Sequence, residues 1–243
     1  MAIHRRFHDS RLRRAAVAWL ASCLLSPVAS YAMAPAAEAQ DLSGTWEVRY
    51  DSQSVPVARL TAKAKAASAA MAVKDIESRR WCRIGGMPFL MLESPLLIIR
   101  QSRAEIVVAP QVQAVARHLY TDGVARADLK DFDPATNGYT VARWEGSVLV
   151  AETSGFSDLG IVTIPGGGYR TENSRLVERF RVLDGGKRLS VTSTWTDPGV
   201  FAQPHTYEVR YYRADAGASA SAQACNPFEA GREAFFAPAL GKK

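Results

Sequence analysis

Hydrophobic and polar residues alternate along much of the chain, and this alternation predicts a mainly β protein. Residues 42–50 show it clearly, with Leu42, Trp46 and Val48 on one face and Glu47 on the other. Comparable short runs recur with hairpin-like links, and nine of them predict a closed antiparallel barrel or a strongly curved sheet. Strands are expected to start at Leu42, Leu96, Glu105, Gln113, Tyr139, Ser147, Arg175, Lys187 and His205.

Two hairpins stand out in this pattern. Arg175–Leu183 and residues 187–197 flank Gly185-Gly186, and a two-residue turn there places the apolar faces of both strands opposite each other. The second hairpin lies around Glu145-Gly146. A two-residue turn and a longer loop with a left-handed Gly146 both fit there, so its register stays open.

One helix is expected near the N-terminus of the barrel domain. Residues 60–81 are rich in Ala, Lys and Met and contain neither Gly nor Pro. Because the apolar face is mostly Ala, we expect it to pack shallowly on a barrel or sheet. Residues 81–95 are typical of a long ordered loop. Residues 155–169, with three consecutive Gly, predict either a lid over one end or a plain long loop.

The first 39 residues predict a secretory signal peptide. An Arg-rich start is followed by the apolar run 15–29 and by small-residue sites, which favour cleavage after Ala32 or Ala39. An alternative interprets residues 20–23 as a lipobox, so that an acylated Cys23 would tether the protein to a membrane. The expected mature protein is periplasmic or secreted. It has no transmembrane span, a single barrel domain over residues 40–243 and a C-terminal tail over 214–243.

Charge and cysteine content narrow the function classes further. Loss of residues 1–39 would lower the formal net charge from +6 to +3, and no Lys/Arg cluster remains that would suit a nucleic-acid partner. Cys82 and Cys225 would then be the only cysteines, and an oxidising compartment favours one disulfide between them. A reactive thiol pair or a metal site is the alternative, but the C-x-x-C spacing is missing.

The Gly44-Thr45-Trp46 motif resembles the G-x-W of lipocalins. In that family the Trp closes the base of a calycin-type barrel, and an Arg from a late strand packs on it. The resemblance implies that Arg210 or Arg213 takes this position here. The resemblance is strengthened by three other expectations: a barrel-like series of strands, secretion, and a disulfide that runs to the C-terminal tail.

Most of the remaining chain resembles a group of uncharacterised secreted bacterial proteins of lipocalin-like outline. The shared stretches are D-L-S-G-T-W, C-R-I-G-G-M-P, Y-T-D-G and W-E-G-S-V-L-V-A-E-T-S-G-F. The chain departs from that group at Ala125-Arg126, where His-Pro is common, at Tyr139, where His is common, and at Ser147, where Asp is common. If those His residues are catalytic in relatives, this protein works differently or only binds.

Three charged residues of the later strands are candidates for acid-base chemistry. Glu178 lies among apolar residues on the inward face, where a carboxylate either pairs with a partner or titrates high. Asp197 and His205 share a face across a short loop and could form a dyad at the barrel rim, although His205 could equally face solvent. Tyr139 would serve as a proton donor.

Aromatic and polar residues gather in residues 120–156 and suggest a cavity for a small, partly apolar ligand. The alternative is ordinary turn chemistry with core aromatics. The expected ligand-binding residues are Tyr120, Asp122, Asn137, Trp144, Trp195 and Tyr207.

The sequence leaves the function between three classes. Motifs of serine hydrolases, nucleotide-binding enzymes and zinc proteases are absent, and neither a cofactor nor a metal is predicted. We therefore expect a barrel that binds a small hydrophobic or aromatic molecule in its interior. The alternatives are a cofactor-independent lyase, isomerase, cyclase or hydrolase that uses the same cavity, and an interaction module of the envelope without a cavity.

Overall fold

A computed structural model describes residues 39–49, 55–83, 85–111, 116–123, 135–215 and 218. All of them belong to the compact unit Ala36–Lys243. The predicted signal peptide, apart from Ala39, and nearly all of the predicted C-terminal tail lie outside the described residues. In the part that is described, no helix combines the length and the apolar character needed to cross a membrane.

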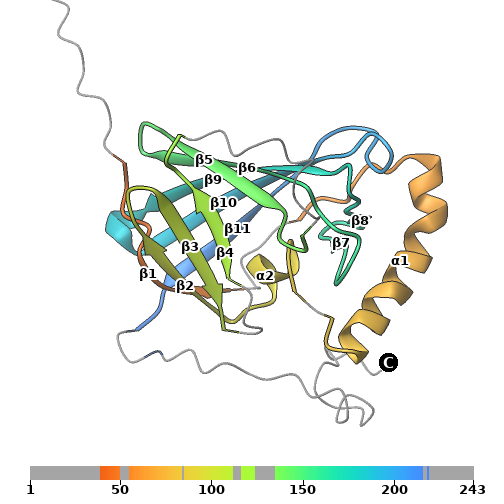
Figure 1. The fold of residues 1–243 in the computed structure, drawn as a ribbon, viewed down its shortest axis with the longest axis horizontal. Coiled ribbons are helices and arrows are strands. Elements are labelled where there is room, and N and C mark those ends of the chain that lie inside the picture. The colour runs from red at the N-terminus through yellow and green to blue at the C-terminus, as the bar shows by residue number, and fades with distance from the viewer. Residues whose placement is uncertain are drawn as a thin grey trace, which may run out of the picture. The chain divides into compact units, whose positions relative to one another are not determined.

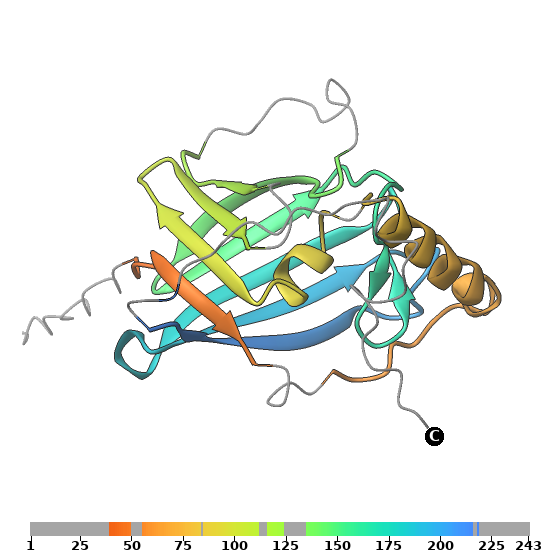
Figure 2. The ribbon, with the colours of Figure 1, turned by 90° about the horizontal axis from the view of Figure 1, so that it is seen from below.

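Nine strands of the described chain form a closed barrel in the order β1-β11-β10-β9-β6-β5-β4-β3-β2 (Figures 1 and 2). The mainly β prediction and the closed barrel are confirmed. The strands are β1 (Gly44–Val48), β2 (Leu96–Gln101), β3 (Glu105–Pro110), β4 (Arg117–Tyr120), β5 (Tyr139–Glu145), β6 (Val148–Ser154), β9 (Arg175–Leu183), β10 (Arg188–Thr196) and β11 (His205–Arg213).

One pair of neighbouring strands departs from the predicted antiparallel pattern. β4 and β5 are parallel and pair through Leu119–Thr140 and Tyr120–Val141. The sequence between them, residues 121–138, is long enough to return the chain to the same end of the barrel, as a parallel connection requires. A wholly antiparallel barrel was therefore the wrong prediction at this one seam.

Both predicted hairpins are present. In the β9–β10 hairpin, Val182 pairs with Leu189 and Glu178 with Ser193, as the two-residue turn predicts. The turn itself spans residues 184–187, which gives the same register as the two-residue turn. The β5–β6 hairpin pairs Glu145 with Val148, so its turn has two residues, and Gly146 supplies the positive φ of 60°.

The predicted helix is α1 (Ala62–Arg80), and Thr61 caps it by accepting a hydrogen bond from the Ala64 amide at 3.1 Å. The helix lies beside a small hairpin of β7 (Thr163–Ile164) and β8 (Gly168–Tyr169) (Figure 1). The buried Asp75 carboxylate accepts hydrogen bonds from the amides of Val162 and Thr163 at 2.8 and 3.1 Å. Residues 155–169 therefore carry an ordered hairpin that holds the helix.

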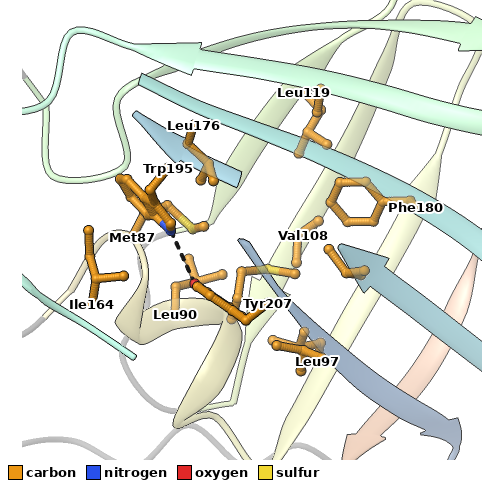
Figure 3. Close-up of a cluster of buried hydrophobic side chains, with 14 of the residues drawn as sticks. Met87, Leu90, Leu97, Val108, Leu119, Ile164, Leu176, Phe180, Trp195 and Tyr207 are labelled. Carbon is orange, nitrogen blue, oxygen red and sulfur yellow. Dashed lines mark hydrogen bonds between the residues drawn. The ribbon is translucent and has the colours of Figure 1, made fainter. Parts of the chain in front are cut away.

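The predicted loop over residues 81–95 contains a short helix, α2 (Phe89–Leu92). Its side chains join the barrel core, where Met87 and Leu90 lie near Trp195 and Tyr207 (Figure 3). The Tyr211 hydroxyl donates a hydrogen bond of 2.5 Å to the Met91 carbonyl. Burial of these apolar side chains is what orders the segment.

Arg170 is buried and holds two loops together through backbone carbonyls. Its guanidinium donates to the Met87 carbonyl at 2.7 Å, to the Leu159 carbonyl at 2.6 Å and to the carbonyls of Ser157 and Ile161. Burial lowers the pKa of Arg170 to about 10, so the side chain is still charged at neutral pH. Nothing in the local sequence pattern indicated this role.

The G-x-W motif has a direct geometric explanation. The Arg213 guanidinium lies 4.2 Å from the Trp46 ring centroid, so Arg213 takes the position that the resemblance assigned to Arg210 or Arg213. Gly44 has a φ of 143°, and a Cβ there would lie 2.0 Å from Arg213 Nη1. A side chain at position 44 would therefore displace the arginine from the tryptophan.

Replacing Gly44 by Ala tests this arrangement. We expect the free energy of unfolding to fall by about 1–3 kcal/mol, because the change adds backbone strain and a clash. Gly185→Ala is the matched control, since Gly185 also has a positive φ but an added Cβ would meet nothing within 4 Å. Urea unfolding followed by tryptophan fluorescence measures both. Equal losses in the two variants would contradict the contact with Arg213.

Candidate binding site

A groove of about 350 Å³ lies where β4, β5, β6 and β9 are neighbours. Because side chains alternate along a strand, most of the residues that line the groove point to the outer face of the barrel. Thr140, Thr153 and Leu176 complete the lining, but they are buried and alternate with the outward residues. The outward residues of the groove are Tyr120, Tyr139, Val141, Glu152, Ser154, Arg175 and Val177.

The strand registers align these residues in rows. Tyr120 pairs with Val141, Val141 with Glu152, and Glu152 with Val177, so one row crosses all four strands. Val141 and Val177 are 38% and 36% exposed and supply the apolar part of the groove. Tyr139 lies in the adjacent row.

The register of the short β4–β5 ladder brings the two tyrosines to one groove. Tyr120 ends β4 and Tyr139 begins β5, and the long connection between them lets both strands run in the same direction. Only the last two residues of β4 pair with β5, and their partners are Thr140 and Val141, so the end of β4 lies next to the beginning of β5. The prediction that Tyr120 and Tyr139 share a site therefore agrees with their positions.

Of the two charged residues in the groove, Glu152 has an ion-pair partner and Arg175 has none among the described residues. Glu152 pairs with Arg143, which also lies 2.9 Å from Glu145. Hydrogen bonds from Arg179 and then Arg143 hold the pKa of Glu145 below its usual range. Among the described residues, Arg175 takes part in no ion pair. The groove therefore offers a cation at one end, beside apolar and aromatic walls.

Three other predicted ligand-binding residues of this region lie outside the groove. Asp122 follows β4 and is exposed. Asn137 is buried, and its side-chain amide donates to the Ala116 carbonyl at 3.3 Å. Trp144 is half-buried and packs against the core from β5. None of them is among the residues that line the groove.

Trp195 and Tyr207 lie in the barrel core (Figure 3). The Trp195 indole N–H donates to the Tyr207 hydroxyl at 3.2 Å, and the two residues are 0% and 4% exposed. Burial raises the pKa of Tyr207 well above its ordinary value. Their neighbours Leu176 and Phe180 are equally buried, so these aromatics pack as core residues.

Glu178 forms a buried ion pair with Arg117 inside the barrel. The two side chains are 0% and 1% exposed, and the same Arg117 Nη2 also donates to the hydroxyls of Thr153 at 2.9 Å and Thr140 at 3.3 Å. Sequence reasoning placed Glu178 inside but missed Arg117. The signal was present, because Arg117 shares the inward face of β4 with Leu119.

The predicted facing positions of Asp197 and His205 need correction. Trp195 pairs with His205, and Asp197 lies beyond the end of β10. The chain turns at Asp197, whose backbone carbonyl accepts from the amides of Val200 and Phe201, so Asp197 leaves the strand ladder. The expected pairing across the rim is therefore wrong by two residues.

Each of these two side chains has its own partners. The Asp197 carboxylate accepts hydrogen bonds from the Thr171 hydroxyl at 2.6 Å, the Ser174 hydroxyl at 2.9 Å and the Gly199 amide at 2.9 Å. The buried His205 has its Nε2 2.7 Å from the Pro165 carbonyl, so this nitrogen carries the proton. No hydrogen bond or ion pair joins Asp197 to His205 in the described structure.

The remaining predictions concern cysteine and metal chemistry. Cys225 lies outside the described residues, so the disulfide with Cys82 stays a prediction. No group of three or more His, Cys, Asp or Glu residues in the described ranges is placed to hold a metal ion.

Comparison with known proteins gives no further guidance. No family model, no curated protein and no solved structure matches the chain.

The buried ion pair can be tested by removing one partner at a time. Glu178→Gln leaves the Arg117 charge uncompensated inside the barrel, which should lower the free energy of unfolding by about 3–5 kcal/mol. The double variant Arg117→Leu with Glu178→Leu should recover much of this loss, because no buried charge then remains. Chemical denaturation measures both.

Glu152→Gln, which breaks the exposed pair with Arg143, is the control and should change stability little. A double variant no more stable than Glu178→Gln would show that the two charges do not act as a pair.

Proposed function

We propose that this protein is a lipocalin-like barrel that binds a small aromatic or apolar molecule with an anionic group. The ligand lies in the groove between Tyr120, Tyr139 and Val177, and its anionic group pairs with Arg175. One observation carries the proposal: two tyrosines from separate strands meet in a cavity with exposed apolar walls and a cation that has no ion-pair partner among the described residues.

The chemistry of the groove supports this class of ligand. Tyrosine rings and valine side chains favour an apolar or aromatic body, while a few polar groups fix its orientation. Arg175 adds a planar guanidinium, which matches a carboxylate or a phosphate. A cavity of about 350 Å³ falls within the lower range of small-molecule sites.

The proposal moves the ligand from the barrel interior, where the sequence placed it, to the outer face. The inward side chains of the described strands, such as Trp46, Leu97, Val108 and Trp195, are fully buried and belong to one contiguous core. Binding in the interior would require these side chains to move apart, whereas the groove already exists.

The lipocalin-like identity and the extracytoplasmic location belong to the same proposal. Support for the former comes from the closed barrel and from Arg213 packed on Trp46. The parallel β4–β5 pair is a departure from a wholly antiparallel barrel. An acid-base enzyme stays a prediction, and Glu178, Asp197 and His205 lie outside the residues that line the groove.

Binding by the purified protein can be tested with a panel of aromatic carboxylates and fatty acids and their uncharged amides. For a carboxylate ligand found by thermal shift, Arg175→Ala should raise the dissociation constant about tenfold, as loss of a charge-assisted hydrogen bond predicts. Binding of the matching amide should change much less. Isothermal titration calorimetry measures both constants.

Arg181→Ala is the matched control, because Arg181 is also exposed on β9 but lies outside the groove. Val141→Glu adds a negative charge to the apolar wall of the groove and should abolish binding of the carboxylate. If affinity survives in both Arg175→Ala and Val141→Glu, the groove is not the site.

A further inference from the structure

His118 lies beside the two tyrosines of the groove. β4 and β5 pair Leu119 with Thr140, which leaves His118 level with Tyr139 one position earlier. The His118 ring also stacks on Tyr120, its neighbour on the outer face of β4, with ring centroids 6.3 Å apart and planes inclined by 19°. His118 is not one of the lining residues, but its side chain is 47% exposed, so it borders the groove at the β4 end.

His118 and Arg175 lie at opposite ends of one row of outward residues. Tyr139 pairs with Ser154 across β5 and β6, and the register of β6 and β9 sets Ser154 level with Arg175. Three strand spacings of about 4.8 Å separate β4 from β9, so the backbones at the two ends lie roughly 14 Å apart. A ligand whose anionic group pairs with Arg175 therefore extends along the row toward His118.

Glu105 fixes the proton of the His118 ring. Its Oε1 lies 2.6 Å from His118 Nδ1. A carboxylate only accepts hydrogen bonds, so Nδ1 carries a proton, and the neutral ring then offers Nε2 as an acceptor.

The same contact sets the direction of Nε2. Glu105 belongs to β3, which lies on the other side of β4 from the groove. Because the two nitrogens lie on different sides of the imidazole ring, Nε2 faces away from Glu105. No hydrogen bond to His118 Nε2 is found within the described ranges of the chain. His118 therefore presents one hydrogen-bond acceptor at the edge of the groove.

We propose, building on the groove site proposed above, that the ligand is an aromatic acid with a hydroxyl group at the end opposite its acid group. His118 selects this hydroxyl, which donates a hydrogen bond to Nε2 while the acid group pairs with Arg175. The body of the ligand lies on Val141 and Val177 between the two ends.

The single acceptor favours a hydroxyl over other groups. An ammonium group has three donors and would leave two of them without a partner at Nε2, whereas a hydroxyl has one donor. A methyl ether has none. The Arg175 and His118 side chains extend over part of the distance between the strands, and the remaining length suits a phenol ring with a short acid chain.

Three matched acids test this selection: para-hydroxyphenylpropionate, its methyl ether and phenylpropionate. The wild-type chain should bind the hydroxyl compound about fivefold more tightly than the other two, as one hydrogen bond predicts. His118→Phe keeps an aromatic ring beside Tyr120 but removes the acceptor. The preference should then be lost, while the affinity for phenylpropionate stays within about twofold of the wild-type value. Isothermal titration calorimetry measures the constants, and circular dichroism verifies the fold.

Arg175→Ala is the control at the other end of the row. It should weaken binding of all three acids by the same factor and keep the preference for the hydroxyl, because substitutions so far apart act additively. If Arg175→Ala weakens binding but His118→Phe keeps the wild-type preference, or if the wild-type chain has none, the role of His118 is overturned and the groove site stands. If Arg175→Ala changes no affinity, the groove site is overturned as well.

The imidazole signals in nuclear magnetic resonance give a test that needs no variant. Titration with para-hydroxyphenylpropionate should shift the Nε2 signal of His118 strongly, and titration with the methyl ether should shift it much less. The buried His205, whose Nε2 lies 2.7 Å from the Pro165 carbonyl, is the internal control and should keep its signal. Equal shifts of the His118 signal with the two acids would overturn the proposal.

Discussion

The pair of strands β4 and β5 has the shortest ladder of the described barrel, and Arg117 links the inner side of this seam to its neighbours. The ladder has only two residue pairs, Leu119–Thr140 and Tyr120–Val141. From β4 the Arg117 guanidinium reaches Thr140 on β5, Thr153 on β6 and Glu178 on β9. One buried cation thus links four neighbouring strands, and the groove lies on the other face of those same strands.

The buried pair of Arg117 and Glu178 lies on the same strands as the candidate binding groove. A buried charge is costly unless it is paired, so the Arg117–Glu178 contact favours strand positions that keep it intact. It does so through Arg117 Nη2 and Glu178 Oε2, while Arg117 Nε and Nη1 and Glu178 Oε1 have no hydrogen-bond partner in the described structure. The backbone positions of Tyr120 and Val141 follow from those strands. The inner polar cluster and the outer groove therefore lie on opposite faces of the same strands. A substitution of Arg117 or Glu178 is expected to alter the geometry of the groove.

Much of the fold could be predicted because strand alternation is a local signal. The β9–β10 register followed from turn residues and matched apolar faces, and α1 followed from an Ala-rich run without Gly or Pro. The parallel seam could not be predicted, because it depends on how the long connection between Tyr120 and Tyr139 returns. The predicted wholly antiparallel barrel was wrong there for that reason.

The candidate site was predicted less completely than the fold. Tyr120 and Tyr139 were chosen from a stretch dense in aromatics and turns, and both line the groove. Arg175 was missed as a site residue because it looks like an ordinary outward residue of an alternating strand. The pairing of Asp197 with His205 failed because a backbone turn at Asp197 ends the ladder, which parity alone cannot reveal.

The proposed binding of a ligand to the outer face of the barrel is tested most directly by residue-resolved nuclear magnetic resonance. Titration with an aromatic carboxylate should shift the amide signals of Tyr120, Val141 and Val177 while leaving the indole signal of Trp195 unchanged. Shifts concentrated at Trp195 and Tyr207, with the groove residues unaffected, would place the ligand in the barrel interior and contradict the account.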